Sequence, residues 1–273
     1  MNHQHCATTF TGLLFALTLT SNLHAITGCT NAYLQGSYGG QLSGTAAGVT
    51  ALSAKSSSTS PQLGLTRLVF DGQGTVTGSA TFDATAAASR SQITGTYSVN
   101  TDCTISLALT NTLAGQQNWN GVLVAGGDRV YLAQIDTAAP FSGSVERARA
   151  LCTAADFNGS YGFRRSGVTL AASAGAANAA ATTSSDSVGF ISADGIGSFS
   201  LSESIAGSGS AGWNVSTGTY TIGEDCSVTL TFDASPGSGA AAVIQGTLTN
   251  NHAGLVTIET RSNLPVAGSF AAQ

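Results

Sequence analysis

Apolar and polar residues alternate along much of the chain, which is the pattern of strands with one buried face. In the segment from Cys226 to Phe232, Val228, Leu230 and Phe232 alternate with serine and threonine. Segments 94–99 and 256–259 show the same period of two. No helical periodicity of useful length occurs, so the chain is predicted to be all-β.

Turn residues separate the predicted strands. Asp71-Gly72 and Asp194-Gly195 supply the positive φ that a tight hairpin demands. The Ala/Ser/Thr-rich segments 45–61 and 171–185 are expected to be loops between the first and second strands of each half. Further turns are expected at 100–102, 125–128, 223–225 and 250–254. The pattern predicts two meanders of about eight strands each.

The chain contains a tandem duplication. Five motifs recur at one offset of 123 positions: Cys29 with Cys152, Gly36-Ser37-Tyr38-Gly39 with Gly159-Ser160-Tyr161-Gly162, Asp71-Gly72 with Asp194-Gly195, Gly95-Thr96-Tyr97 with Gly218-Thr219-Tyr220, and Asp102-Cys103 with Asp225-Cys226. Later the offset becomes 125, as Gly143 aligns with Gly268. The boundary falls at about residues 149–151, which predicts domains over 26–149 and 150–273.

The simplest way for eight meandering strands to avoid unpaired edge strands is to close into a barrel. The predicted fold is therefore two tandem antiparallel up-and-down β-barrels with apolar inner faces, and a flattened sandwich is the alternative. An outer-membrane barrel is not expected, because the outward faces are polar and aromatic girdles are missing.

Residues 1–25 read as a signal peptide, with an apolar run at 13–19 and cleavage after Ala25. Because that run is too short to cross a bilayer, no membrane span is expected. We expect a secreted, extracellular or cell-surface protein, with the periplasm as another possible location.

Four of the five cysteines remain after cleavage, since Cys6 leaves with the signal peptide. Cys29 and Cys103 lie 74 positions apart, and so do Cys152 and Cys226. An even number in an exported chain predicts disulfides, and the equal spacing pairs them as Cys29–Cys103 and Cys152–Cys226. A competing interpretation is that Ile26-Thr27-Gly28-Cys29 is a lipobox with a lipid on Cys29.

The charge pattern limits the possible partners. Only 8% of residues are charged, the net charge is −5, and Lys55 is the single lysine. A nucleic-acid partner needs a basic stripe, and attachment to anionic lipid needs a basic cluster, so neither is expected.

The paired cysteines, the Gly-Ser-Tyr-Gly opening, the Asp-Gly-x-Gly turn and the Gly-Thr-Tyr…Asp-Cys block resemble secreted bacterial barrel proteins of uncharacterised function. Their plan is similar to calycin and allene-oxide-cyclase-like barrels. The resemblance covers both repeats, but its residues are structural, so it implies the fold and no activity.

Each residue with functional chemistry also has a structural interpretation. The Asp-Gly pairs suggest calcium, but hairpin turns need the same residues. Asp102 and Asp225 are expected to cap turns, and His252 to be a solvated loop residue. Trp119 and Trp213 are expected to pack in the core or at its rim rather than stack on carbohydrate.

The remaining candidates are surface features. Asn158 and Asn214 begin glycosylation sequons, which matter only in a eukaryotic source. Arg164-Arg165 and Arg147/Arg149 are expected to be solvated. No catalytic residue, cofactor or metal site is predicted.

Low charge, small neutral side chains and tandem copies favour a non-catalytic structural or interaction protein of the cell surface or matrix, which assembles with itself or binds another surface component. The alternative is a carrier of a small apolar ligand inside a barrel. A carboxylate-only enzyme is the third hypothesis.

Overall fold

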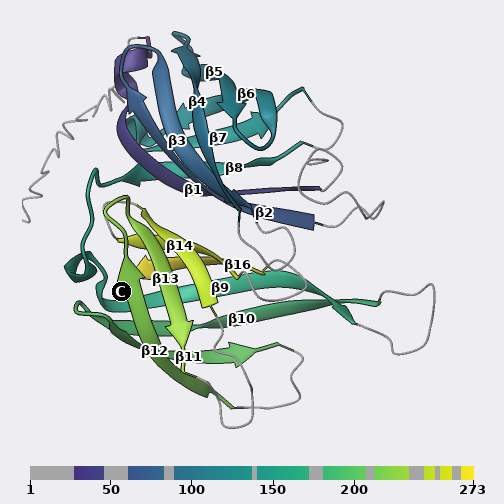
Figure 1. Ribbon diagram of the computed structural model, residues 1–273, viewed down its shortest axis with the longest axis vertical. Helices are drawn as coiled ribbons and strands as arrows, with labels where there is room; N and C mark the ends of the chain where they lie inside the picture. Colours follow the sequence, from purple (N-terminus) through teal and green to yellow (C-terminus); the bar gives the residue numbers. More distant parts are fainter. Residues whose placement is uncertain are drawn as a thin grey trace, which may run out of the picture.

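The protein forms two closed eight-stranded barrels, one after the other along the chain (Figure 1). The computed structural model describes residues 28–45, 61–82, 89–136, 140–171, 181–206, 212–233, 243–249, 253–259 and 266–273. The proposed signal peptide lies outside these residues.

Barrel 1 contains eight strands: β1 (Gln35–Thr45), β2 (Pro61–Asp71), β3 (Thr75–Phe82), β4 (Ser89–Val99), β5 (Thr104–Asn111), β6 (Gly115–Val124), β7 (Arg129–Gln134) and β8 (Ser142–Ala148). Barrel 2 contains β9 (Asn158–Ala171), β10 (Ala181–Asp194), β11 (Ser198–Ile205), β12 (Asn214–Ile222), β13 (Ser227–Phe232), β14 (Val243–Thr249), β15 (Gly254–Glu259) and β16 (Val266–Ala272). Short 3-10 turns lie at η1 (Asn31–Tyr33), η3 (Ala125–Gly127) and η4 (Ala154–Asp156).

Each strand pairs antiparallel with the next, and the last strand of each barrel closes on its first. β8 pairs with β1, with Val145 opposite Gly40, and β16 pairs with β9, with Phe270 opposite Phe163. Closure gives every strand two neighbours and leaves neither barrel with a free edge. The predicted all-β fold of two up-and-down barrels is confirmed.

The two barrels share one tyrosine hydrogen bond, although the aromatic rings around it differ, because Ala193 of barrel 2 stands at the position of Phe70 and Phe157 at that of Leu34. In barrel 1, Phe70 packs edge-on against Tyr38 and Tyr97, with ring centroids 5.3 and 5.0 Å apart. The Tyr97 hydroxyl donates to the Leu34 carbonyl at 2.9 Å, and the Tyr220 hydroxyl donates to the Phe157 carbonyl at the same distance. The Tyr of the repeated Gly-Thr-Tyr motif thus fixes the N-terminal segment across one end of each barrel.

One disulfide stabilises each barrel at that same end. Cys29 is bonded to Cys103, and Cys152 is bonded to Cys226. Cys103 and Cys226 immediately precede β5 and β13, so each bond ties the incoming chain to the fifth strand of its barrel. The Cys29 sulfur is engaged in this bond, which argues against a lipid at that position.

One predicted loop is shorter than expected. Residues 181–185 belong to β10 and pair with β9, with Ser185 opposite Gly167. Their Ala/Thr/Ser composition has no apolar alternation, but backbone pairing does not require one. The resulting β9–β10 hairpin projects beyond the rest of barrel 2 (Figure 1).

Among the described residues, side chains pack closely in the interior of barrel 1 around Trp119. The space that remains among Leu68, Phe82, Trp119 and their neighbours is about 10 Å³, which is room for one water molecule at most. In the described part of the chain, no helix is long and apolar enough to cross a membrane.

Candidate functional site between the two barrels

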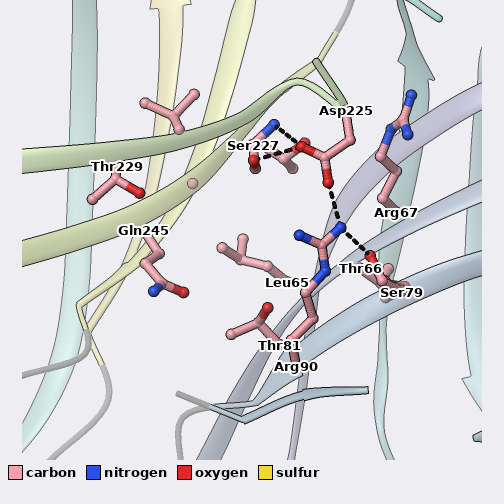
Figure 2. Close-up of a pocket in the computed structure, with 13 residues that line it drawn as sticks. Leu65, Thr66, Arg67, Ser79, Thr81, Arg90, Asp225, Ser227, Thr229 and Gln245 are labelled. Atoms are coloured by element: carbon pink, nitrogen blue, oxygen red, sulfur yellow. Dashed lines mark hydrogen bonds and ion pairs between the residues drawn. The ribbon is translucent and has the colours of Figure 1, made fainter. Parts of the chain in front are cut away.

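A polar cleft of about 190 Å³ lies between the barrels. Barrel 1 contributes the outer side of β2, β3 and the start of β4, and barrel 2 contributes the outer side of β13 and β14 (Figure 2). These strands come from different repeats, so the cleft exists only because the barrels pack together.

Strand register aligns the lining residues in rows. In barrel 1, Arg67 lies opposite Ser79 and Thr81 lies opposite Arg90. In barrel 2, Ser227 lies opposite Thr247 and Thr229 lies opposite Gln245. The first wall carries both guanidinium groups, and the second carries hydroxyl and amide groups.

An ion pair between Arg90 and Asp225 bridges the two walls. Arg90 also donates to the Ser79 hydroxyl at 3.2 Å, and Asp225 accepts from the Ser227 hydroxyl at 2.5 Å (Figure 2). Burial raises the pKa of Asp225, but the hydrogen bonds from Ser227 and Arg90 outweigh it, so the net pKa lies below its ordinary value. The bridge is therefore charged at neutral pH.

The second guanidinium of the cleft, Arg67, has a different environment. It donates to the Ser37 hydroxyl and to the Ala150 carbonyl, both at 3.0 Å. Its Nε is buried and has no hydrogen-bond partner among the described residues, and the same is true of the Thr247 hydroxyl. Burial is the main cause that lowers the pKa of Arg67, and nearby Arg90 adds to it.

Apolar and backbone contacts hold the barrels together around the cleft. Leu65 and Ile258 are buried, yet their positions in β2 and β15 alternate with residues of the barrel cores. Because both face outward, the burial comes from the opposite barrel, and β2 contacts β15. The Gln41 side-chain amide donates to the Thr257 carbonyl across the junction at 3.0 Å.

The predicted turn residues act as turn residues. Asp71 Oδ1 accepts from the backbone amides of Gln73, Gly74 and Thr75 at 2.7–2.9 Å. Asp194 makes the equivalent three bonds in barrel 2. Asp102 caps its turn through Thr104 at 3.0 Å, whereas Asp225 caps a turn and also forms the bridge to Arg90. In the described part of the chain, no group of three His, Cys, Asp or Glu side chains has metal-binding geometry.

The two tryptophans lie in different environments. Trp119 is buried in the core of barrel 1. Trp213 is exposed on the outer side of barrel 2, where its ring centroid lies 6.2 Å from that of Phe190. Core packing was thus the correct interpretation only for Trp119. His252 lies outside the described residues.

The prediction of solvated arginines is wrong for Arg165. Its side chain is only 12% exposed and pairs with Glu203 at 3.4 Å. In β9 the odd-numbered positions Tyr161 and Phe163 face the core, and Arg165 continues that series, whereas Arg164 is exposed.

The other predicted surface residues lie as follows. Arg147 donates to Asp128 at 2.8 Å and lies over the Tyr38 ring, and Arg149 pairs with Asp156. Asn158 and Asn214 are exposed at the starts of β9 and β12.

The sequence reasoning missed Arg67 and Arg90. The repeat alignment contained a signal for them, because the offset of 123 makes Phe190 the equivalent of Arg67 and Trp213 the equivalent of Arg90. Two cations in one repeat thus replace two aromatic residues in the other, which marks this face as one on which the repeats have diverged.

No family model matches this chain, and no curated protein matches it either. Among solved structures, the isotype 1 transferrin binding protein B from serogroup B Neisseria meningitidis is 6% identical, over 86% of this chain and 74% of that chain, with a TM-score of 0.31. The Myxococcus xanthus hemagglutinin in complex with α3,α6-mannopentaose is 11% identical, over 85% of this chain and 99% of that chain, with a TM-score of 0.16. Similarities this weak say nothing about function.

Proposed function

We propose that this chain is an exported, non-catalytic structural or interaction protein of the cell surface or extracellular matrix. The observation that carries the proposal is the close packing of the described side chains inside barrel 1. A barrel without an internal cavity binds through its outer faces. The outer faces of this protein include a polar cleft and an exposed aromatic pair.

Export is supported by cysteine chemistry. Four cysteines form two disulfides, and such bonds persist in oxidising compartments such as the periplasm or the extracellular space. The cleft offers guanidinium, carboxylate, hydroxyl and amide groups, and none of its lining residues is a histidine or cysteine. This chemistry suits binding better than nucleophilic catalysis.

The geometry does not favour the alternative of a carrier for an apolar ligand. The described interior of barrel 1 has no room for such a ligand around Trp119, and the inward side of barrel 2 carries the Arg165–Glu203 pair, which an apolar ligand would desolvate further.

Native mass spectrometry without reductant, on protein recovered from its natural host, tests the proposal. We expect whole-protomer multiples or a complex with another surface component, without a small bound molecule. A bound mass of a few hundred daltons, released on denaturation, would instead support the carrier. A strictly monomeric protein that binds no surface component would overturn the proposed function.

A further inference from the structure

The duplication gives each barrel the same two outer faces. We call face A the outer side of β2–β4 in barrel 1 and of β10–β12 in barrel 2. Face B is the outer side of β5–β7 in barrel 1 and of β13–β15 in barrel 2. The register is conserved between the copies: Arg67 opposite Ser79 becomes Phe190 opposite Ser202, and Thr104 opposite Val122 becomes Ser227 opposite Thr247.

Within the molecule, face A of barrel 1 meets face B of barrel 2 mainly through β2, which contacts β14 and β15. The Arg90–Asp225 bridge and the cleft lie at this contact. Next to it, β1 contacts β14, and a Cβ added to Gly39 would lie 2.9 Å from the Thr247 hydroxyl oxygen. The two faces are different surfaces, so the contact is head-to-tail rather than symmetric.

The internal contact leaves one copy of each face unused. Face A of barrel 2 carries four exposed apolar side chains: Val188, Phe190, Trp213 and Val215. Val188 is the equivalent of Leu65, but it is 53% exposed where Leu65 is 7% exposed. The residue that the internal contact buries in barrel 1 is therefore uncovered in barrel 2.

Face B of barrel 1 is the other unused surface. Val122 stands where barrel 2 has Thr247, and it is 45% exposed where Thr247 is 5% exposed. Its neighbour across the strand pair, Tyr131, is the equivalent of Val256 and is exposed as well; it lies at the border of the internal junction, where it lines a second hollow with Val256 and Ser269 of barrel 2. Val122 and Tyr131 both line an open hollow of about 580 Å³ on this face.

The two unused faces match each other chemically. In the internal contact, cations on face A meet hydroxyl and carboxylate groups on face B. On the unused faces the guanidinium groups are replaced by aromatic rings, and Thr247 is replaced by a valine. Both partners of the second contact have thus become more apolar, as a pair that buries each other requires.

We propose that face A of barrel 2 docks on face B of barrel 1 of a second copy of this chain, in the arrangement that already joins the two barrels internally. Repetition of this head-to-tail contact gives a closed ring or an open filament. The closed barrels have no edge strands for pairing, so association proceeds face to face. This inference rests on the proposed surface role and names its partner.

Sedimentation velocity and negative-stain electron microscopy on the purified, oxidised mature chain test the contact. We expect the wild-type mass to rise with concentration through whole-protomer multiples, with rings or filaments visible. Trp213→Glu on face A or Val122→Glu on face B weakens self-association at least about tenfold. Both side chains are exposed, so circular dichroism and the melting temperature of the protomer stay at wild-type values. The matched control is Ile196→Glu, which adds the same charge at an exposed apolar residue outside both faces and leaves assembly unchanged.

Mixing the two variants gives the sharpest result. The Trp213→Glu chain keeps an intact face B on barrel 1, and the Val122→Glu chain keeps an intact face A on barrel 2. An equimolar mixture should form a dimer that grows no further. A wild-type protein that stays monomeric at all concentrations, or assemblies that neither variant weakens, would overturn the inference. A monomer that still binds another surface component would overturn the inference alone and leave the proposed function standing.

Discussion

At the scale of single residues, one carboxylate organises each of the two Asp-Gly turns. Asp71 is exposed, but three backbone amides point at one of its oxygens. The hydrogen bonds from Gln73 and Thr75 are the main causes that lower the pKa of Asp71 to about 2. The Asp-Gly motif therefore uses the acid as an acceptor for turn amides, and the glycine supplies the positive φ.

The low pKa of Asp71 gives a pH-dependent contribution to stability. The folded pKa lies below the ordinary value of 3.8, so the stabilising contribution is complete above that value and is lost as the pH falls through about 2. We expect carbon-detected NMR to show the Asp71 carboxyl titrating near pH 2. In Asp71→Asn, the free energy of unfolding should depend less on pH between 3.8 and about 2 than it does in the wild type. A midpoint near the ordinary value would contradict the role of the amides.

The buried pair Arg165–Glu203 is the second residue-scale case. Glu203→Gln replaces a charged acceptor of a mostly buried guanidinium with a neutral one, so we expect the free energy of unfolding to fall by roughly 2 kcal/mol. The control is Glu146→Gln, which breaks the more exposed pair with Arg129 and should cost less than about 1 kcal/mol. Urea denaturation measures both. Equal losses in the two variants would contradict the burial argument.

At the scale of elements, glycines allow the strands to approach closely. Gly218 of the Gly-Thr-Tyr motif lies in β12, and a Cβ added there would lie 2.2 Å from the Thr231 carbonyl oxygen in β13. The equivalent distance for Gly95 is 2.2 Å to the Ala108 carbonyl oxygen. Because the obstruction is backbone, a neighbouring side chain cannot relieve it by changing rotamer.

Gly218→Ala should therefore destabilise barrel 2 by about 2 kcal/mol or more through a local shift of β13. Thr219→Ala, at the exposed neighbouring position, should change the unfolding free energy by less than about 0.5 kcal/mol. Thermal denaturation followed by circular dichroism separates the two. A Gly218→Ala protein as stable as wild type would show that the strands move apart at little cost.

Many of the strands and turns could be predicted from the sequence, because they depend on local patterns of residues. Period-two alternation located β13, the Asp-Gly pairs located turns, and the duplication doubled the information for each. Arg165 was misplaced because a charged residue in an inward position looks like a surface residue until its partner, 38 positions away, is known. The cleft was missed because its walls come from different repeats and depend on how the barrels pack.

At the scale of the whole molecule, the fixed junction between the barrels couples their stabilities. Leu65 and Ile258 face outward from their own barrels and are buried by the other. Each barrel therefore loses contacts when the other unfolds. Val188 is the equivalent of Leu65, but it is exposed in the single chain. It therefore does not contribute to this coupling.

The same substitution should affect different properties at these two equivalent positions. Leu65→Asp places a charge in the buried junction but leaves both barrel cores intact, so we expect one cooperative transition to separate into two. In scanning calorimetry, the ratio of calorimetric to van't Hoff enthalpy should rise from near one to well above one. Val188→Asp should leave the unfolding of dilute protomer at the wild-type pattern and weaken only self-association. If Leu65→Asp unfolds in a single transition like wild type, the junction does not couple the barrels, and it then offers no template for a contact between molecules.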